Sequence, residues 1–182
     1  MLVVSEHEQL PVAEARTGDA EAWNALFKRY QLPLYSYVCE LLHDEQSSLD
    51  VVQEAFINAA RHIGGLRQDD KFGSWLFGIA HQKCVQRWRK MRPEETSIDQ
   101  SDDDYADEVA GPEELLIRKE QEAAFMRLLE QLAPAHRSVL LLHFIEDFSL
   151  EEIAGITETP VGTVKSRLHY AKKAFKKLLE ET

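Results

Sequence analysis

The chain has 182 residues, a hydrophobic content of 44% and a formal net charge of −11. This apolar share supports a packed core and excludes a chain that is disordered throughout. No apolar run approaches the roughly 20 residues that span a bilayer, and the N-terminal MLVV lacks the basic flank of a signal peptide. We therefore expect a cytoplasmic protein without direct membrane insertion. Two cysteines, Cys39 and Cys84, are too few for a disulfide framework.

The acidic excess is concentrated in one segment. Residues 96–114 hold eight acidic residues and no basic one, whereas residues 115–182 hold ten of each. Like charges at this density repel one another, and the segment has no helical apolar period, so we predict an extended linker between two lobes. The expected organisation is a tail over 1–12, a first domain over 13–93, a linker over 94–114 and a second domain over 115–182.

The first predicted helix follows Asp19, which is a good N-cap residue. Its large apolar residues have the spacing of one helical face. They are Trp23, Leu26, Phe27 and Tyr30. Pro33 predicts a break or kink before LYSYVCELL, because proline removes a helical hydrogen bond.

A third helix is predicted to be capped by Ser48 and to end at Gly64-Gly65. Its expected apolar face consists of Leu49, Val52, Phe56, Ala60 and Ile63. A further helix follows, with four residues expected to face inward, namely Phe72, Trp75, Leu76 and Ile79.

The window from Lys71 to Pro93 contains six basic residues and no acidic one. Aromatic side chains interleave with them, at Phe72, Trp75, Phe77 and Trp88. Basic charge with aromatic rings can bind single-stranded nucleic acid, since the rings stack on unpaired bases. The alternative is packing, because Phe72 and Trp75 also fit the core face of their helix.

The second lobe is also predicted to be helical. Apolar residues recur there at helical spacing, at Phe125, Leu128, Leu129 and Leu132. Pro134 suits the first turn of the next helix, which carries VLLLHFI. Ser149 and Glu152 form a capping box, and Thr159 is predicted to cap a last helix with Pro160 at its first position. No segment alternates with period two, so we predict an all-α fold of two small helical domains.

The last helix lies in an acid-free strip. Residues 159–177 carry six basic side chains and no acidic one. A helical wheel places five apolar residues on one stripe, Val164, Leu168, Ala171, Phe175 and Leu178. The side chains that point away from it are Lys165, Ser166, His169, Lys173, Lys176 and Lys177.

A short capped helix, a tight turn and a second helix with a basic outer face predict a helix-turn-helix. The second helix of this motif enters the DNA major groove, where lysine and arginine neutralise phosphates. A solvated basic face at a helix C-terminus is the alternative.

Three motifs occur in order along the chain. D-x-x-Q-E-x-F begins at Asp50, F-x-x-W-L-x-x-I-A at Phe72, and P-x-G-T-V-K-S-R-L at Pro160. Together they resemble the sigma factors of the extracytoplasmic-function group within the bacterial sigma-70 superfamily. The resemblance covers nearly all of the chain outside the first dozen residues and the acidic linker. It implies a transcription initiation factor that binds core RNA polymerase at its clamp and flap and directs it to promoter DNA.

The resemblance also implies roles for individual residues. Those that would bind the polymerase clamp are Asp50, Gln53, Glu54 and Phe56. The minus-ten element would be opened and read by the loop from Gly65 to Phe72 and the helix after it, through Lys71, Phe72, Trp75, His81, Gln82, Lys83, Gln86 and Arg87. The minus-thirty-five element would be read by Lys165, Ser166, His169 and Tyr170, with phosphate contacts from Thr163, Arg167 and Lys173.

Partners and cofactors follow from the same resemblance. It implies a monomer, no cofactor and no metal, because the chemistry belongs to the polymerase. Inhibitory anti-sigma factors are usual partners in this family. Isolated binding to DNA is expected to be weak, because an acidic protein is repelled by DNA beyond its local basic patches.

Departures from the family pattern affect three places. Acidic residues usually precede Asp50, where this chain has Ser47, Ser48 and Leu49. Phosphorylation of Ser47 or Ser48 would restore that charge, and a simple capping role for Ser48 is the alternative. A second departure concerns minus-ten specificity, since Gln82 and Gln86 replace the usual Asn and Asp.

The third departure is Glu158, which replaces the usual glycine of the helix-turn-helix turn. A left-handed backbone costs a non-glycine residue about 1 kcal/mol, so we expect a differently shaped turn.

Two other functions compete with this interpretation. A stand-alone helix-turn-helix regulator accounts for the second lobe but leaves the first lobe without a role, and it would normally need a dimer. An enzyme is suggested only by His81-x-x-Cys84, which offers two metal ligands without a second pair at useful spacing. Because no glycine-rich phosphate loop is present either, we predict that the chain is not an enzyme.

Overall fold

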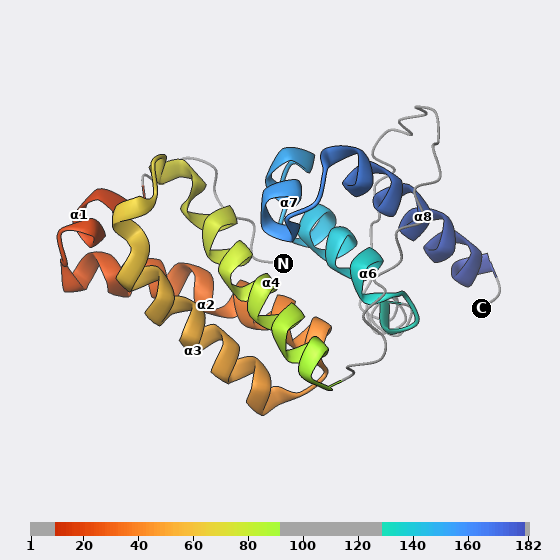
Figure 1. Ribbon diagram of the computed structural model, residues 1–182, viewed down its shortest axis with the longest axis horizontal. Helices are drawn as coiled ribbons and strands as arrows, with labels where there is room; N and C mark the ends of the chain where they lie inside the picture. Colours follow the sequence, from red (N-terminus) through yellow and green to blue (C-terminus); the bar gives the residue numbers. More distant parts are fainter. Residues whose placement is uncertain (1–9, 92–128, 181–182) are drawn as a thin grey trace. The chain divides into compact units, whose positions relative to one another are not determined.

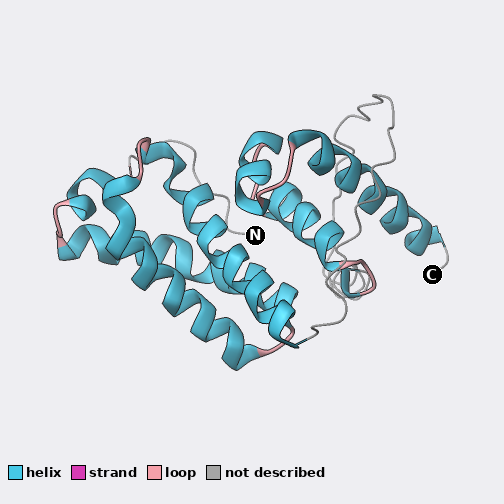
Figure 2. Ribbon diagram, viewed as in Figure 1, coloured by secondary structure: helices cyan, strands magenta, loops and turns pink. Residues whose placement is uncertain are grey.

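The computed structural model describes residues 10–91 and 129–180. Every regular element within these two ranges is helical, and neither range contains a strand (Figure 2). The chain divides into two compact units, Met1–Trp88 and Arg89–Thr182. Within the described parts of both units, no helix is long and apolar enough to cross a bilayer. The predicted all-α fold is confirmed.

Residues 10–91 form four α-helices and two short 3-10 turns (Figure 1). In chain order they are α1 (Val12–Arg16), α2 (Ala20–Leu42), α3 (Glu45–His62), η1 (Ile63–Gly65), η2 (Asp69–Lys71) and α4 (Phe72–Met91). The helix α1 falls at the start of the predicted first domain, where the sequence pattern indicated no helix.

The helix α2 begins directly after Asp19, as predicted. The carboxylate of Asp19 accepts a hydrogen bond from the backbone N–H of Ala22, at 2.8 Å, as an N-cap does. The predicted break at Pro33 is wrong, because α2 runs through this proline to Leu42. Burial of Leu34 and Tyr37 on the next turn favours the continuous helix despite the missing N–H.

The start of α3 differs from the prediction. Asp44 is the N-cap, and its carboxylate accepts from the backbone N–H of Ser47 at 2.7 Å. Ser48 lies one turn inside the helix, fully buried, and its Oγ donates to the Asp44 carbonyl at 2.6 Å. The predicted cap at Ser48 is therefore wrong, since the helix begins before it.

The predicted apolar face of α3 is confirmed at Val52, Phe56 and Ile63, but the buried face differs at the other two positions. Val51, Ala55 and Ala59 are fully buried, whereas Leu49 and Ala60 are exposed. Alanine adds little to a hydrophobic pattern, but its small side chain lets packed helices approach closely. The pattern therefore gave too much weight to Leu49.

Aromatic packing joins α2 to the start of α4. Phe72 is fully buried, and its ring lies 6.3 Å from that of Trp23 and 5.5 Å from that of Tyr30, centroid to centroid. Phe27 was predicted to face inward, but it is 42% exposed and covers Phe56 at 4.9 Å. Edge and tilted contacts of this kind stabilise a core beyond the area they bury.

The second unit contains four described helical elements. They are α6 (Pro134–Leu140), the π-helical segment η3 (Leu141–Ile145), α7 (Leu150–Thr157) and α8 (Val161–Glu180). Pro134 occupies the first turn of α6 as predicted. The capping box of α7 is also confirmed, because Ser149 and Glu152 exchange both of its hydrogen bonds.

The core of the second unit confirms much of the predicted apolar pattern. Burial of Leu129 and Leu132 agrees with the prediction, and the other two residues of that pattern, Phe125 and Leu128, lie outside the described residues. Along α8 the buried residues are Val164, Leu168 and Ala171, which are the predicted stripe. The side chains of Phe175 and Leu178 fall outside the described ones.

A buried arginine stabilises this unit. The guanidinium of Arg137, 5% exposed, donates to three main-chain carbonyls, those of Leu129 at 2.8 Å, Glu130 at 2.9 Å and Leu132 at 3.1 Å. Carbonyls where a helix ends lack intrahelical partners, so Arg137 satisfies groups that burial would otherwise leave unbonded.

The turn between α7 and α8 keeps a left-handed residue. Glu158 has φ 52° and ψ 41°, so it adopts the conformation that a glycine would supply, and the expected change of turn shape is wrong. The Pro160 carbonyl accepts the first helical bond, from Val164 N at 3.1 Å. The helix thus begins one residue later than predicted, and the Thr159 hydroxyl bonds instead to that of Thr157 at 2.8 Å.

Candidate nucleic-acid and polymerase interfaces

The outer face of α8 is basic. Lys165, His169 and Lys173 are exposed on three successive turns. Residues one turn apart on a helix lie side by side, so these three form one row. The other predicted minus-thirty-five contacts are half-buried, namely Thr163, Ser166, Arg167 and Tyr170.

Contacts within the unit orient some of these side chains. The Ser166 hydroxyl donates to the carbonyl of Thr163 at 3.1 Å, and the Tyr170 ring lies 6.3 Å from that of His136. Partial burial lowers the pKa of the Arg167 guanidinium. The α8 face therefore combines exposed cations with side chains that the fold already holds.

The outer side of α4 carries the second basic surface. Gln86 is exposed, and the half-buried residues here are Lys71, Trp75, Gln82, Lys83 and Arg87. Two predicted minus-ten contacts lie in the core instead: Phe72 is fully buried, and His81 is 6% exposed with its Nδ1 2.8 Å from the Tyr37 hydroxyl. Their side chains support the helix from inside and do not reach its surface.

Burial also decides the chemistry of Cys84. It raises the pKa of this fully buried thiol to about 12, so the neutral thiol predominates and is a poor metal ligand. Within residues 10–91 and 129–180, no three His, Cys, Asp or Glu side chains are grouped to hold a metal ion.

The solvent face of α3 presents polar and apolar side chains together. Gln53 and Glu54 are exposed and Asp50 is half-buried, whereas Phe56, at 8% exposure, is covered by Phe27. Two large apolar residues flank the polar ones, Leu49 at 49% and Ile57 at 45% exposure. Sequence reasoning missed this pair as surface residues, although their eight-residue separation with Gln53 midway is the spacing of one helical face.

An ion-pair cluster joins α3 to α4. One carboxylate oxygen of Glu54 accepts from the Lys83 ammonium at 2.8 Å, and the other accepts from the Arg87 guanidinium at 3.2 Å. The Lys83 hydrogen bond and the two positive charges hold the pKa of Glu54 below its usual range. One predicted clamp contact is thus paired with two predicted DNA contacts.

The serines before Asp50 are already engaged. Hydrogen bonds from Ser47 hold the pKa of the Asp44 carboxyl below its usual range. A phosphate on Ser47 would therefore lie beside a carboxylate, which repels it. Ser48 is fully buried, so its hydroxyl is not accessible for modification. The idea that phosphorylation replaces the missing acidic residues gains no support at either serine.

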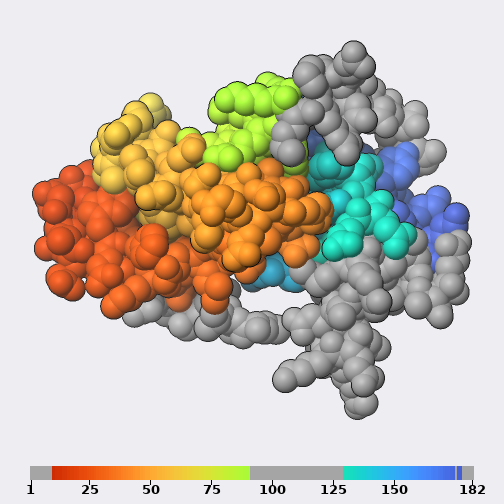
Figure 3. Space-filling model, turned by 90° about the horizontal axis from the view of Figure 1, so that it is seen from below, coloured from red at the N-terminus to blue at the C-terminus, as the bar shows by residue number. Residues whose placement is uncertain are grey.

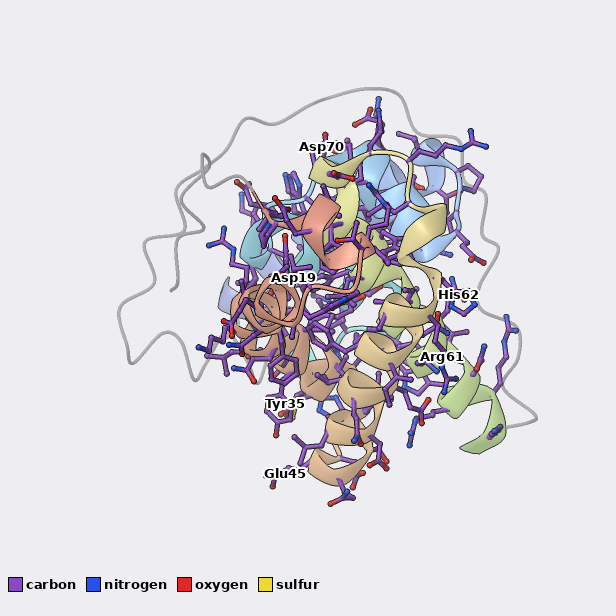
Figure 4. The ribbon with its side chains drawn as sticks, turned by 90° about the vertical axis from the view of Figure 1, so that its left-hand side faces the viewer. Asp19, Tyr35, Glu45, Arg61, His62 and Asp70 are labelled. Atoms are coloured by element: carbon purple, nitrogen blue, oxygen red, sulfur yellow. The ribbon has the colours of Figure 1, made fainter. Side chains whose placement is uncertain are left out.

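The loop from Leu66 to Lys71 precedes α4. Figure 4 places Asp70 at one end of the first unit and Glu45, where α3 begins, at the other. The Arg16 side chain of α1 reaches this loop, with an Nη atom 2.6 Å from the Asp69 carboxylate and 3.1 Å from the Leu66 carbonyl.

Two family models match this chain. The model of sigma-70 region 2 covers residues 26–93, and that of sigma-70 region 4 covers residues 122–175. The first range includes most of α2, all of α3 and all of α4, and the second includes the helix-turn-helix.

Curated relatives match over almost their whole length. The RNA polymerase sigma-H factor of Pseudomonas aeruginosa is 32% identical over 98% of this chain and 97% of its own. The ECF RNA polymerase sigma-E factor of Escherichia coli K12 is 33% identical over 92% of each chain. The ECF RNA polymerase sigma factor SigW of Bacillus subtilis is 29% identical over 93% of this chain and 95% of its own.

Solved structures support the same fold. CnrH, in its complex with the cytosolic domain of CnrY, superposes with a TM-score of 0.67 at 23% identity, covering 94% of this chain and 96% of the other. The sigma factor RpoE of Bartonella quintana, in complex with the anti-sigma factor NepR, gives a TM-score of 0.63 at 24% identity, covering 85% and 96%.

The fold and its basic surfaces define a helical DNA-binding protein of two units, one of which carries a helix-turn-helix. The chain belongs to the sigma-70 family of RNA polymerase sigma factors, within its extracytoplasmic-function group. It is therefore a transcription initiation factor that directs RNA polymerase to promoters, and the predicted family is confirmed.

Proposed function

We propose that this sigma factor uses three surfaces of the described residues. The solvent face of α3 binds core RNA polymerase, the Leu66–Lys71 loop with α4 reads the minus-ten element, and the outer face of α8 reads the minus-thirty-five element. The observation that carries this proposal is the row of exposed Lys165, His169 and Lys173 directly after the helix-turn-helix turn. An acid-free row that holds two lysines at this place suits a phosphate backbone and the base edges beside it.

The polymerase surface is centred on Asp50, Gln53 and Glu54. Exposed Leu49 and Ile57 extend it, because protein interfaces combine an apolar centre with polar groups around it. We assign Phe56 a supporting role, since it packs under Phe27.

The minus-ten surface retains six of the eight predicted contacts, namely Lys71, Trp75, Gln82, Lys83, Gln86 and Arg87. Phe72 and His81 hold α4 in place from the core. Exposed Arg89 and Lys90 continue the basic surface towards the end of the helix. A half-buried Trp75 beside this charge can stack on an unpaired base.

Two kinds of contact alternate along α8 in the proposed minus-thirty-five surface. Base edges would be met by Lys165, Ser166, His169 and Tyr170, and phosphates by Thr163, Arg167 and Lys173. The contacts that specify sequence are thus separate from those that supply affinity.

The wider setting follows from the family. The protein acts in the cytoplasm with RNA polymerase, performs no chemistry of its own and binds as a monomer. An anti-sigma factor is its expected inhibitor, as NepR is the partner of the Bartonella quintana relative in its solved complex. A stand-alone regulator would bind operators without polymerase, and run-off transcription with purified core enzyme distinguishes the two.

The polymerase surface is tested by the double change Asp50→Lys/Glu54→Lys. We expect it to lower affinity for core polymerase by at least about 100-fold, because it reverses charge facing basic clamp groups and leaves Lys83 and Arg87 unpaired. The measurement is co-purification and titration with labelled core enzyme.

The matched control is Glu14→Lys/Glu21→Lys, which makes the same change in net charge at exposed positions of α1 and α2. Circular dichroism checks that both proteins stay helical. The assignment of α3 to polymerase binding would be wrong if the Asp50→Lys/Glu54→Lys variant kept its polymerase affinity. It would also be wrong if this variant and the control lost affinity equally.

A further inference from the structure

The Leu66–Lys71 loop has no buried side chain to fix its shape. Arg67, Gln68 and Asp70 are exposed, and no residue of η2 is buried. A segment with few buried apolar contacts lies at the low-stability end of a fold. Its conformation therefore depends on polar contacts made to it from elsewhere.

One arginine of α1 supplies two such contacts. The same Nη atom of Arg16 donates to the Leu66 carbonyl at 3.1 Å and to the Asp69 carboxylate at 2.6 Å. These acceptors lie on either side of Arg67 and Gln68, so the guanidinium closes the bend that presents both. A planar guanidinium suits this, since its donors are held in fixed directions.

The Arg16 side chain starts from a fixed backbone. Val12 and Ala15 of α1 are buried, and the Ala15 carbonyl accepts from the indole N–H of Trp23 at 2.9 Å. The Trp23 ring in turn contacts Phe72, the first residue after the loop. Figures 1 and 3 show the red residues of α1 beside the yellow residues that follow α3. The loop is thus held at its start, middle and end.

We propose that Arg16 is a positioning residue for minus-ten recognition. It holds the loop so that Arg67, Gln68 and Asp70 present one arrangement to the promoter, and it neutralises Asp69, whose charge would repel DNA. This inference rests on the proposed minus-ten surface and extends it to a helix outside the region 2 match, which begins at residue 26.

The test uses holoenzyme assembled from core polymerase and the full chain. Labelled single-stranded oligonucleotides carry either the minus-ten sequence that wild type prefers or single-base changes in it. Arg16→Ala is expected to lower the affinity for the preferred oligonucleotide about fivefold, because it removes a partly exposed ion pair and one hydrogen bond. The ratio of the affinities for the preferred and the altered oligonucleotides also falls, because the loop no longer keeps one conformation.

Other properties of the Arg16→Ala holoenzyme stay unchanged. Affinities for a minus-thirty-five duplex and for core polymerase remain those of wild type. Arg16→Lys gives an intermediate ratio, since an ammonium keeps the charge but lacks the rigid fork. Asp69→Ala leaves α1 intact and also lowers the ratio, because it breaks the Arg16–Asp69 contact, so it tests this contact even where Arg16→Ala unfolds.

Two controls separate positioning from general effects. Arg61→Ala removes an equal charge from an exposed site that Figure 4 shows well apart from Asp70, and it leaves the ratio unchanged. The double variant Arg16→Ala/Asp69→Ala is no worse than Arg16→Ala, because Arg16→Ala already removes the Arg16–Asp69 contact.

Each contrary outcome has a distinct meaning. If wild-type holoenzyme shows no base preference in these oligonucleotides, the proposed minus-ten surface fails and the role of Arg16 fails with it. If wild type discriminates and Arg16→Ala discriminates equally well, the inference about Arg16 alone is overturned. An equal loss in Arg61→Ala, or additive losses in the double variant, overturns it too.

Discussion

The two units place their charged side chains differently. In the first unit, ion pairs lie at the surface: Arg16 binds Asp69, and Glu54 binds both Lys83 and Arg87. In the second unit, Arg137 is buried, and partial burial shifts the pKa of the half-buried Glu146. The paired charges of the first unit therefore affect what its surface offers to partners. In the second unit, Arg137 and Glu146 affect stability, separately from the exposed Lys165, His169 and Lys173 of α8.

The largest expected effect on stability comes from replacing Arg137. Arg137→Ala should lower the free energy of unfolding of the second unit by about 3–5 kcal/mol, because three carbonyls lose their donor and a cavity opens. All three tryptophans, Trp23, Trp75 and Trp88, lie in the first unit, so their fluorescence reports on that unit alone. We expect an unchanged tryptophan transition and an earlier transition by circular dichroism.

The matched variant of the first unit is Arg16→Ala, which removes a partly exposed arginine. It should cost less than about 1 kcal/mol, since exposed pairs contribute little. Equal losses of unfolding free energy in Arg137→Ala and Arg16→Ala would show that the buried and the exposed arginine contribute equally to stability.

The carboxyl group of Glu146 should make the stability of the second unit depend on pH. Burial raises the pKa of its carboxyl to about 7, so folding favours the protonated form. The contribution of the protonated carboxyl to the free energy of unfolding is fully present below the ordinary pKa of a glutamate. It is lost as the pH rises through about 7. Glu146→Gln should therefore match wild type near pH 5 and be more stable by about 2–3 kcal/mol at pH 8.

The measurement is denaturant unfolding followed by circular dichroism at both pH values. Asp147→Asn, which removes an exposed neighbouring charge, controls for net charge. A Glu146→Gln advantage that is the same at pH 5 and pH 8 would show that ionisation of this carboxyl does not govern the stability of the second unit.

The smallest expected effect is at Glu54. Glu54→Gln frees Lys83 and Arg87, so the isolated protein should bind a single-stranded minus-ten oligonucleotide about two- to fivefold more tightly at low salt. The gain should shrink as salt rises, because exposed charges are screened. Glu45→Gln removes the same charge from an exposed site on the same helix, and an equal gain there would attribute the effect to net charge.

Local signals in the sequence predicted much of the fold. Asp19, Pro134 and the Ser149–Glu152 capping box each act on residues within one helical turn, so their chemistry is readable without the rest of the chain. Periodicity likewise predicted the buried stripe of α8.

Competition between nearby signals was harder to resolve. Asp44 and Ser48 are both good cap residues four positions apart, and burial of Ser48 within α3 decides between them. Pro33 is a helix-breaking signal that packing of the following turn overrides. Local preference could settle neither case, because both depend on tertiary contacts.

The candidate sites show the same limit. Motifs indicated candidate functional helices. Periodicity correctly predicted that Phe72 lies inside, although the resemblance implied a DNA contact for it, but it did not show that His81 lies inside. The ion pairs are long-range contacts, with Arg16 and Asp69 53 positions apart and Glu54 and Lys83 29 apart. No sequence spacing predicts such pairs, because only the packed fold brings their residues together.

Run-off transcription from a promoter library shows whether this chain directs polymerase to promoters through the outer face of α8. Purified core polymerase would transcribe templates randomised at both promoter elements, with wild type, Lys165→Ala or Lys173→Ala added. We predict polymerase-dependent transcription from a defined subset. Lys165→Ala should change which minus-thirty-five sequences are used, by about 1–3 kcal/mol per lost base contact, whereas Lys173→Ala should weaken all promoters alike. An identical promoter ranking for wild type and Lys165→Ala, or no transcription with wild type, would contradict the account.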